Sequence, residues 1–339
     1  MLRIGMIGVG RWGKNHLRIL TQIPESRVVA VFDTEEKSRA YVRQVAPGVA
    51  LAGSADDVIR RSDAVVIATP SSLHGRLAKA ALESGRHVFV EKPLSVSFQE
   101  AKILEKLAAK KRRILQVGHL LLYHPAVGWL RQALKQGKFG RILYLYSQRV
   151  NLGVVRRDEN VVSSLATHDI SVCLHLLGEF PSRIICAGQS YLQKNIEDIA
   201  FAILSFPSGA VAHFHMSWLD PHKTRKITLV GSRRMAVFDD MASEEKLRVF
   251  DKGVVGSRFL TSGVDLPPSS LAVRYGDIFA PKLSLEEPLK IELIEFVRCA
   301  ISGRKPVADA RNGVEVLAVL EGLQNSLKRN GKAVSLKKP

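Results

Sequence analysis

The chain has 339 residues, of which 46% are hydrophobic and 6% aromatic, and its 50 Lys and Arg residues against 32 Asp and Glu residues produce a net charge of +18. The length predicts two domains. The ordinary apolar fraction excludes a disordered, collagen-like or disulfide-dense protein. No apolar run is long enough to predict a membrane span or a signal peptide. The basic residues are spread along the whole chain without interleaved aromatic residues, which argues against a nucleic-acid partner and predicts a basic surface that attracts anionic ligands.

Up to about residue 120, short apolar runs alternate with amphipathic stretches, which is the pattern of a parallel sheet built from βαβ units. The predicted strands are Leu2–Val9, Val28–Phe32, Ala64–Thr69, His87–Val90 and Ile114–Val117, with a weaker strand near Ala50. The predicted helices are Gly13–Gln22, Glu35–Val45, Leu73–Glu83 and Phe98–Lys110. We therefore expect a doubly wound α/β domain over residues 1–120.

From Arg141 onward the apolar runs lengthen and are separated by turns, which predicts a mostly antiparallel sheet. The predicted strands are Ile142–Arg149, Arg183–Gln189, Ala200–Phe206, Ala210–Trp218, Lys226–Val230 and Met235–Asp239. The predicted helices are Thr167–Leu177, Lys290–Ser302 and Gly313–Lys328. Residues 121–339 are thus expected to form an α+β domain whose last helix can pack back on the first domain. Gly253–Pro288 has no clear period and is predicted to be a long loop.

A glycine-rich loop, Gly8-Val9-Gly10-Arg11-Trp12-Gly13, lies between the first predicted strand and the first predicted helix. Glycines allow the backbone to turn tightly and to approach a pyrophosphate, whose charge is stabilised at a helix N-terminus. The loop therefore predicts a Rossmann domain that binds a dinucleotide.

Asp33 ends the next predicted strand 20 residues after Gly13, where a carboxylate can accept hydrogen bonds from the ribose hydroxyls of the dinucleotide. Because the same carboxylate would repel a 2′-phosphate, the pattern favours NAD as the cofactor over NADP. Lys37 and Arg39 nearby keep NADP open as the alternative.

Two segments at predicted strand ends, Ala68-Thr69-Pro70 and Val90-Glu91-Lys92-Pro93, complete a set of motifs with the glycine loop. As a set they resemble the glucose-fructose oxidoreductase/inositol dehydrogenase/MocA family, over nearly the whole chain. The resemblance implies a Rossmann domain joined to an open-faced, mostly antiparallel β-sheet domain. It also implies an enzyme that moves a hydride between a nicotinamide and a sugar or cyclitol carbon.

The resemblance assigns roles to particular residues of this chain. The cofactor-binding set that it implies is Gly8, Gly10, Arg11, Trp12, Gly13, Asp33, Thr69, Pro70, His74, Glu91, Lys92 and Pro93. Pro93 corresponds to a proline that is often cis in the family. His168 corresponds to the acid/base histidine, and Lys92 is its expected electrostatic partner at the developing alkoxide.

Two positions depart from the family pattern. The aspartate that many members carry four residues before the histidine is Ser164 here, so another group must orient His168. The asparagine of the family's Tyr-Asn-Pro motif is His124 here, which puts its family role in doubt.

The second half more narrowly resembles a branch of nucleotide-sugar 3-dehydrogenases. The segments that carry this narrower resemblance include Gly118-His119, Tyr123-His124-Pro125-Ala126, Asn151-Leu152-Gly153, Arg157-Asp158-Glu159-Asn160 and Ala166-Thr167-His168-Asp169-Ile170-Ser171. The resemblance implies oxidation at C3 of UDP-N-acetylglucosamine or its uronate in polysaccharide precursor synthesis. The substrate-binding residues expected from these segments are Tyr123, Asn151, Arg156, Arg157, Asn160 and His168.

Three of these residues have a second interpretation. Arg156 and Arg157 either clamp a diphosphate or lie in a solvated loop, and Tyr123 either contacts the sugar or fills the core.

Metal binding is not expected. His213 and His215 alternate on one predicted strand, but no third ligand follows, so packing at the outer sheet face is the expected role. Cys173, Cys186 and Cys299 lie far apart without a CxxC motif, which argues against a zinc site and predicts a reducing, cytoplasmic location. An open sheet face exposes apolar residues, so we expect a homodimer or homotetramer formed through it.

The function that these residues indicate is an NAD-dependent dehydrogenase of a nucleotide sugar. A dehydrogenase of free sugars or inositol is the alternative among enzymes. A non-catalytic, dinucleotide-binding regulatory protein is the alternative of another class, favoured by Ser164 and opposed by the presence of Lys92 and His168.

Overall fold

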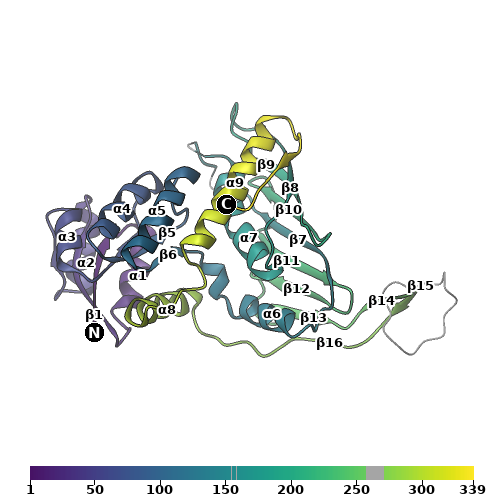
Figure 1. Cartoon of the computed structure of the whole chain (residues 1–339), viewed down its shortest axis with the longest axis horizontal. Coiled ribbons are helices and arrows are strands. Elements are labelled where there is room, and N and C mark those ends of the chain that lie inside the picture. Colours follow the sequence, from purple (N-terminus) through teal and green to yellow (C-terminus); the bar gives the residue numbers. More distant parts are fainter. Residues whose placement is uncertain (154, 158, 257–270) are drawn as a thin grey trace. The chain divides into compact units, whose positions relative to one another are not determined.

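The computed structural model describes residues 1–153, 155–157, 159–256 and 271–339, which fold into two compact units (Figure 1). Unit 1 comprises Met1–His124, Glu286–Ala318 and Pro339, and unit 2 comprises Pro125–Leu285 and Val319–Lys338. Unit 1 therefore includes the segment Glu286–Ala318, which the sequence pattern alone assigned to the second domain.

Unit 1 is built on a six-stranded parallel sheet with the strand order β3-β2-β1-β4-β5-β6. Its strands are β1 (Leu2–Ile7), β2 (Ser26–Phe32), β3 (Ala50–Leu51), β4 (Ala64–Ile67), β5 (His87–Glu91) and β6 (Leu115–Gly118). Its helices include α1 (Arg11–Leu20), α2 (Glu36–Val45), α3 (Ala55–Arg61), α4 (His74–Glu83) and α5 (Phe98–Lys111), and η1 (Ser71–Leu73) and η2 (Leu120–Tyr123) are short 3₁₀ helices. Since the strand order reverses at β1 and β4, ligands of such a sheet bind beyond the carboxyl ends of these strands.

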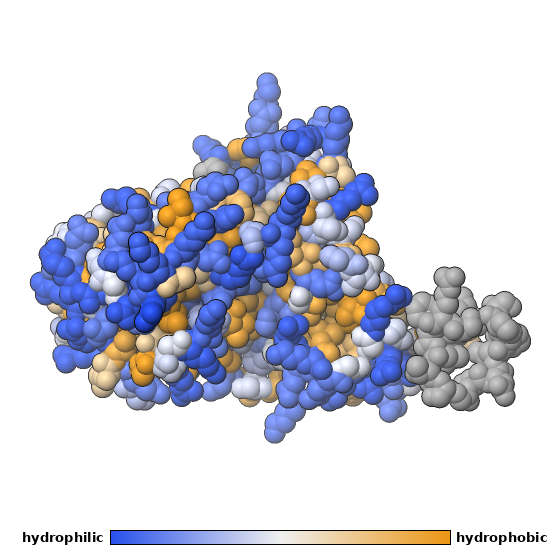
Figure 2. All heavy atoms as spheres, viewed as in Figure 1, coloured by the Kyte–Doolittle hydropathy of each residue, from blue (hydrophilic) through white to orange (hydrophobic). Residues whose placement is uncertain are grey.

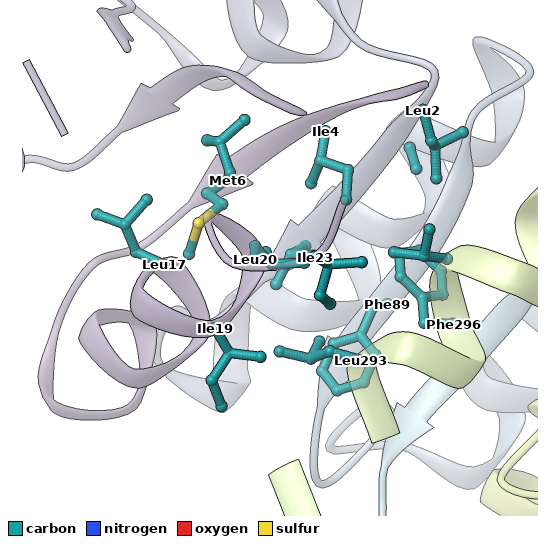
Figure 3. Close-up of a cluster of buried hydrophobic side chains, with 14 of the residues drawn as sticks. Leu2, Ile4, Met6, Leu17, Ile19, Leu20, Ile23, Phe89, Leu293 and Phe296 are labelled. Atoms are coloured by element: carbon teal, nitrogen blue, oxygen red, sulfur yellow. The ribbon is translucent and has the colours of Figure 1, made fainter. Parts of the chain in front are cut away.

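Helix α8 (Pro288–Ser302) belongs to unit 1 because its apolar face is part of the core of that unit. Leu293 and Phe296 of α8 pack in one buried cluster with Ile19 of α1 and Phe89 of β5 (Figure 3). Phe296 and Phe89 meet edge to face with ring centroids 5.6 Å apart. Burying such side chains contributes about 1.5–3 kcal/mol each, which accounts for the return of this distant segment to the first unit.

Unit 2 is built on a nine-stranded sheet in the part of the chain that the structure describes, with the order β16-β13-β12-β11-β7-β10-β9-β8-β17. The central strands are β7 (Ile142–Val150), β8 (Arg183–Gln189), β9 (Ile199–Ser205), β10 (Val211–Ser217), β11 (Thr224–Gly231) and β12 (Met235–Asp239). The edge strands are β13 (Leu247–Phe250), β16 (Ile278–Phe279) and β17 (Val334–Ser335). The pair β7 and β10 is parallel and the other pairs are antiparallel, so the predicted mostly antiparallel sheet is confirmed.

Helix α7 (Val161–Leu177) packs on strands β7, β9 and β10, and α6 (Pro125–Lys135) packs on α7. Helix α9 (Ala310–Lys328) contributes its first part to unit 1 and the rest to unit 2. Along β10 the side chains alternate between buried residues and partly exposed residues, as expected for a strand that is covered on one face.

The face of the unit 2 sheet that carries the outward side chains displays large apolar residues. Tyr144, Phe201, Ile203 and Val211 are between 37% and 47% exposed. The strand register places Val211 beside Tyr144 and His213 beside Tyr146 and Ile203, so these side chains share one face. The face of the molecule seen in Figure 2 carries many hydrophilic residues, in keeping with the high content of Lys and Arg, with hydrophobic residues exposed between them.

The structure corrects several element predictions. Helices α3 and α6 were not predicted, and α7 begins at Val161 rather than at Thr167. The early start of α7 has a local cause, because the Asn160 side chain accepts a hydrogen bond from the Ser163 amide and caps the helix.

The segment Gly253–Pro288, predicted to be one long loop, contains short strands in its described part. These are β14 (Gly253–Gly256), β15 (Leu271–Arg274) and β16, of which the first two form a separate antiparallel pair. Residues 257–270 of this predicted loop lie outside the described residues. No helix in the described ranges is long and apolar enough to cross a membrane.

Candidate functional site

The glycine loop joins β1 to α1 and has a separate steric requirement at each glycine. Gly8 has a φ of +91°, and a Cβ there would lie 2.7 Å from the backbone of Ala68. A Cβ at Gly13 would collide with the carbonyl oxygen of Gly8, whereas a Cβ at Gly10 would meet nothing within 4 Å. Gly8 and Gly13 therefore allow close packing within the protein, and Gly10 leaves space where a ligand can approach the backbone.

The N-terminus of α1 lies directly after this space. Gly10 caps the helix without a side-chain hydrogen bond, and no acidic residue lies in the first turn. Arg11 and Trp12 are exposed there, with Trp12 at 47%. The backbone N–H groups and the positive end of the helix dipole suit the two negative charges of a pyrophosphate.

Asp33 follows β2 and contacts the glycine loop directly. The Val9 amide donates to Asp33 Oδ2 at 2.6 Å, and the Glu35 amide donates to Oδ1 at 2.8 Å. Each carboxylate oxygen can accept a further hydrogen bond, so the group can both hold the loop and bind ribose hydroxyls. Sequence spacing indicated the second role only.

Arg39, which left NADP open, is engaged by groups of its own unit. It donates to Glu36 Oε2 at 2.8 Å and to the carbonyl oxygens of Asp33 and Thr34 at 3.0 and 2.8 Å. Its guanidinium group is thus held by three acceptors beside Asp33.

His74 connects the segments that follow β4 and β5. Its Nδ1 lies 2.7 Å from the Pro93 carbonyl oxygen and its Nε2 lies 2.9 Å from the Thr69 carbonyl oxygen, and the residue is 1% exposed. Both ring nitrogens thus lie within hydrogen-bond distance of backbone carbonyl oxygens. His74 therefore holds two of the predicted cofactor segments, Thr69-Pro70 and Lys92-Pro93, at a defined separation.

The Glu91-Lys92-Pro93 segment lies at the carboxyl end of β5, and its Lys92-Pro93 peptide bond is cis, which confirms the expectation for Pro93. His16 Nε2 donates to Glu91 Oε1 at 2.7 Å, and the Lys92 amide donates to Glu91 Oε2 at 3.1 Å. Burial by itself would raise the pKa of Glu91, but the hydrogen bond and charge of His16 and the Lys92 amide hold it below its ordinary value. Glu91 is therefore an anion that fixes the backbone at Lys92.

His119, at the end of β6, is a neutral neighbour of this segment. Its Nδ1 lies 2.6 Å from Asn312 Oδ1. Burial lowers the pKa of His119 to about 4, and the positive charge of Lys92 contributes to the shift. Nothing in the sequence pattern pointed to this pair, because Asn312 follows His119 by 193 positions.

In unit 2, His168 is half-buried on α7, and the following residue anchors the helix to the sheet. Asp169 Oδ2 accepts from Arg149 Nε at 2.7 Å, and its Oδ1 accepts from Arg149 NH2 at 2.9 Å and from Ser147 Oγ at 2.8 Å. Asp169 is 1% exposed and Arg149 7% exposed. This bidentate ion pair fixes α7 against β7, so it positions His168 through the helix backbone. The Thr-His-Asp segment was noted in the sequence, but the partner on β7 was not.

Tyr123, expected to contact the sugar, is a core residue of unit 1. It is 7% exposed, and its hydroxyl donates to Glu295 Oε2 at 2.6 Å. The same hydroxyl accepts from Gln116 Nε2 and from the Ala308 amide. Since these three bonds use the hydroxyl fully, we correct the prediction and omit Tyr123 from the substrate contacts.

Asn160 and Asn151 both have partners within unit 2. Besides capping α7, Asn160 donates to Glu197 Oε2 at 2.8 Å, and its contact with the substrate remains a prediction. Asn151 Oδ1 accepts from Arg225 NH2 at 2.9 Å.

Arg156 and Arg157 are exposed, and Arg156 pairs with Glu159 at 3.1 Å. Both lie between residues 154 and 158, which are outside the described residues. Their predicted contact with a diphosphate remains a prediction.

His213 and His215 stack with aromatic residues on the outward face of the sheet. His213 stacks with Tyr146 at a centroid distance of 5.2 Å, and His215 stacks with Phe201 at 4.6 Å. Burial lowers the pKa of both histidines, which favours neutral, stacking rings. In the described ranges of the chain, no group of three or more His, Cys, Asp or Glu side chains is arranged to hold a metal ion.

The parallel sheet, the glycine loop and the Asp33 carboxylate beside it are the features of a dinucleotide-binding oxidoreductase. Residues 2–119 match the family described as "Oxidoreductase family, NAD-binding Rossmann fold", and residues 127–237 match "GFO/IDH/MocA C-terminal domain". The chain belongs to the glucose-fructose oxidoreductase/inositol dehydrogenase/MocA family and is an NAD(P)-dependent dehydrogenase that acts on CH–OH groups.

Among its relatives, the UDP-N-acetylglucosamine 3-dehydrogenase of Acidithiobacillus ferrooxidans is 29% identical over 319 residues, which cover 94% of each chain. The scyllo-inositol 2-dehydrogenase (NAD(+)) of Bacillus subtilis is 24% identical over 99% of this chain and 96% of that protein. A solved structure of the Acidithiobacillus ferrooxidans enzyme, GnnA, is similar with a TM-score of 0.83 at 27% identity, covering 97% of this chain and 98% of that chain. The WlbA dehydrogenase from Bordetella pertussis, solved with NADH and UDP-GlcNAcA, shares the fold with a TM-score of 0.78 at 21% identity, covering 99% of each chain.

Proposed function

We propose that this protein is an NAD-dependent dehydrogenase that oxidises the C3 hydroxyl of a UDP-linked N-acetylhexosamine or its uronate, in the synthesis of glycan precursors. The observation that carries the proposal is the similarity to UDP-N-acetylglucosamine 3-dehydrogenase, which extends over 94% of both chains rather than over the dinucleotide-binding part alone. The net charge of +18 supports an anionic substrate.

The cofactor, when bound, accepts the hydride from the sugar carbon. Removal of that hydride requires a base for the hydroxyl proton, and His168 is the residue proposed to accept it. Lys92 is proposed to stabilise the oxygen as it gains negative charge. The ion pair of Asp169 holds the helix that carries His168, and Glu91 holds the backbone at Lys92.

NAD is the proposed cofactor rather than NADP. The Asp33 carboxylate beside the glycine loop would repel a 2′-phosphate. Arg39 donates hydrogen bonds to Glu36 and to the carbonyl oxygens of Asp33 and Thr34. These bonds oppose a reorientation of its guanidinium group toward a phosphate.

The proposed assembly is a homodimer or homotetramer that covers the outward face of the unit 2 sheet. Tyr144, Phe201, Ile203 and Val211 expose apolar surface on neighbouring strands, and the stacked histidine and aromatic rings extend it. A second copy of the same face would bury this surface in a two-fold contact.

Inositol is the second candidate substrate, because the scyllo-inositol dehydrogenase is similar over 99% of this chain. Inositol is an uncharged cyclitol and carries no diphosphate for Arg156 and Arg157 to bind. A panel of UDP-sugars, free sugars and inositols, assayed by NADH absorbance, separates the two candidates. Turnover of inositol without turnover of any UDP-sugar would overturn the proposed substrate class.

The catalytic assignment is tested with Lys92→Ala and His168→Ala in the same assay. Loss of a positioned acid/base group is expected to lower kcat by about 10²–10⁴ while NADH binding, measured by titration, stays nearly unchanged. Near-normal turnover of both variants would show that other residues carry the proton transfer. A wild type that binds NADH and turns over none of the panel would support the alternative that the chain binds a dinucleotide without catalysis.

A further inference from the structure

Glu91 lies in a buried polar layer on one face of the unit 1 sheet. In the parallel register Phe89 is paired with Gln116 and Glu91 with Gly118, so these four residues lie side by side on β5 and β6. A Cβ at Gly118 would lie 3.0 Å from Glu91 Oε2, so the glycine provides the space in which the carboxylate lies. Gly118 on β6 thus leaves room for the Glu91 carboxylate next to Lys92.

Helix α8 brings a second carboxyl group, that of Glu292, to the same layer. Phe296 contacts Phe89 edge to face at 5.6 Å, and Phe89 contacts the His16 ring edge to face at 5.2 Å. Glu292 precedes Phe296 by four residues, about 6 Å along a helix, and Glu91 follows Phe89 by two residues, about 7 Å along a strand. Gln116 Nε2 donates to the Glu292 carbonyl oxygen at 3.2 Å, which fixes this turn of α8 against β6.

The Glu292 side chain is buried without donors around it. The residue is 1% exposed, and within the described ranges neither of its carboxyl oxygens has a hydrogen-bond partner. Gln116 Oε1 and His16 Nδ1 likewise have none among the described residues. An ionised carboxylate in such a place would lose its hydration without compensation, whereas the neutral acid loses much less.

The charged and titratable groups around Glu292 come from several elements. His16 lies on α1, Glu91 on β5, Tyr123 on η2 and Glu295 on α8 itself, while β1 contributes only Arg3, which is exposed and paired with Asp63. Burial raises the pKa of Glu292 well above its ordinary value, and repulsion from Glu91 and Glu295 adds to the shift. The environments of Glu91 and Glu292 therefore separate the two groups into an anion and a neutral acid.

We propose that Glu292 is a positioning residue for the Glu91-Lys92-Pro93 segment. Its side chain stays a neutral carboxylic acid. Glu91 is then the anion of this layer, and its carboxylate binds His16 and the Lys92 amide. Ionisation of Glu292 would place a second negative charge beside Glu91. Repulsion between the two carboxylates would disturb the orientation in which Glu91 accepts from His16 and from the Lys92 amide. The role in catalysis rests on the proposed function of Lys92, whereas the charge state of Glu292 does not.

The charge state is tested by the pH dependence of stability in Glu292→Gln. A raised folded-state pKa means that the stabilising proton is present in full below the ordinary pKa of 4.5 and is lost as the pH rises toward the folded-state pKa. Gln cannot ionise. The unfolding equilibrium constant of the wild type divided by that of the variant, called the stability ratio below, should therefore rise by up to tenfold per pH unit from about pH 4.5 until the pH reaches the folded-state pKa. Urea unfolding between pH 5 and pH 9 measures this ratio, and hydrogen exchange of the α8 amides assigns it to unit 1.

Glu83→Gln is the matched control, because Glu83 is an exposed glutamate of unit 1 with 55% side-chain exposure. Its ratio to wild type should stay flat across the same pH range. Glu292→Met is also uncharged and of similar volume, so its stability ratio to wild type should change with pH as that of Glu292→Gln does. It provides the same test if Glu292→Gln folds poorly.

The positioning role is tested by NADH titration at each pH. NADH affinity of the wild type relative to Glu292→Gln should stay constant while the stability ratio rises, because the folded protein keeps the Glu292 proton over that range. It should fall at the higher pH at which the ratio levels off and the folded protein loses this proton, an effect that a purely structural role would not produce. A stability ratio that stays flat from pH 5 to pH 9 in both Glu292→Gln and Glu292→Met would overturn the neutral acid. A relative NADH affinity that does not fall from pH 5 to pH 9 would overturn the positioning role. None of these measurements uses the sugar substrate, so they are independent of the proposed substrate class.

Discussion

The buried ion pair between Asp169 and Arg149 offers the most quantitative test of how His168 is held. In Asp169→Ala the guanidinium group of Arg149, 7% exposed, loses its carboxylate, and the Ser147 hydroxyl loses its acceptor. Removal of one partner of a buried pair costs about 3–5 kcal/mol, because the remaining charge stays buried without compensation. For a unit of this size the expected fall in Tm is about 6–20 °C.

Lys226→Ala is the matched control on the same sheet. Lys226 pairs with Asp239 at 3.2 Å, but its side chain is 39% exposed. Loss of an exposed pair changes stability by about 1 kcal/mol or less. Urea unfolding of both variants compares the two pairs under identical conditions.

The double variant Asp169→Leu, Arg149→Met separates a buried unpaired charge from a general loss of packing. Replacement of both partners by apolar residues of similar volume is often nearly neutral, so the double variant should be more stable than Asp169→Ala. Below its melting range, Asp169→Ala should also lower kcat more than Lys226→Ala does, because α7 carries His168. The reasoning is wrong if Asp169→Ala costs no more than Lys226→Ala.

Three further predictions follow from the site. Asp33→Ala should narrow or reverse the preference for NAD over NADP, because repulsion of the 2′-phosphate and the ribose hydrogen bonds are lost together; Kd values for NADH and NADPH measure this, and a wild-type preference for NADPH would contradict the assignment. Arg157→Ala should raise KM for the nucleotide sugar much more than it changes kcat, since a remote clamp binds ground and transition states alike; unchanged KM values in both Arg156→Ala and Arg157→Ala would favour a solvated loop. Ser164→Asp should raise the pKa of His168 from one helical turn away, so the acidic limb of the kcat/KM profile should move to higher pH; an unmoved limb would argue against His168 as the base.

The sequence by itself was sufficient for the features that depend on local pattern. The βαβ rhythm up to residue 120 and the spacing from Gly13 to Asp33 predicted the parallel sheet and the position of the Asp33 carboxylate beside the glycine loop, since period and turn chemistry are encoded by neighbouring residues. The resemblance carried by Glu91-Lys92-Pro93 added the cis bond at Pro93 and the family.

Local pattern was misleading where one residue type suits two roles. Tyr123 and Asn160 have chemistry that suits a sugar, but their side chains serve the core and a helix cap. The helical pattern predicted a start at Thr167, whereas α7 begins at Val161, where the Asn160 side chain caps the helix.

Only the tertiary structure decided which distant groups meet. His16 binds Glu91 across 75 positions, and His119 meets Asn312 across 193. The charge states of Glu91 and Glu292 follow from the same packing, because burial and nearby charge, rather than residue type, determine whether a carboxyl group ionises. The sequence thus determined the fold class and the dinucleotide loop, whereas the support behind Lys92 and His168 was decided by side chains that only the folded chain brings together.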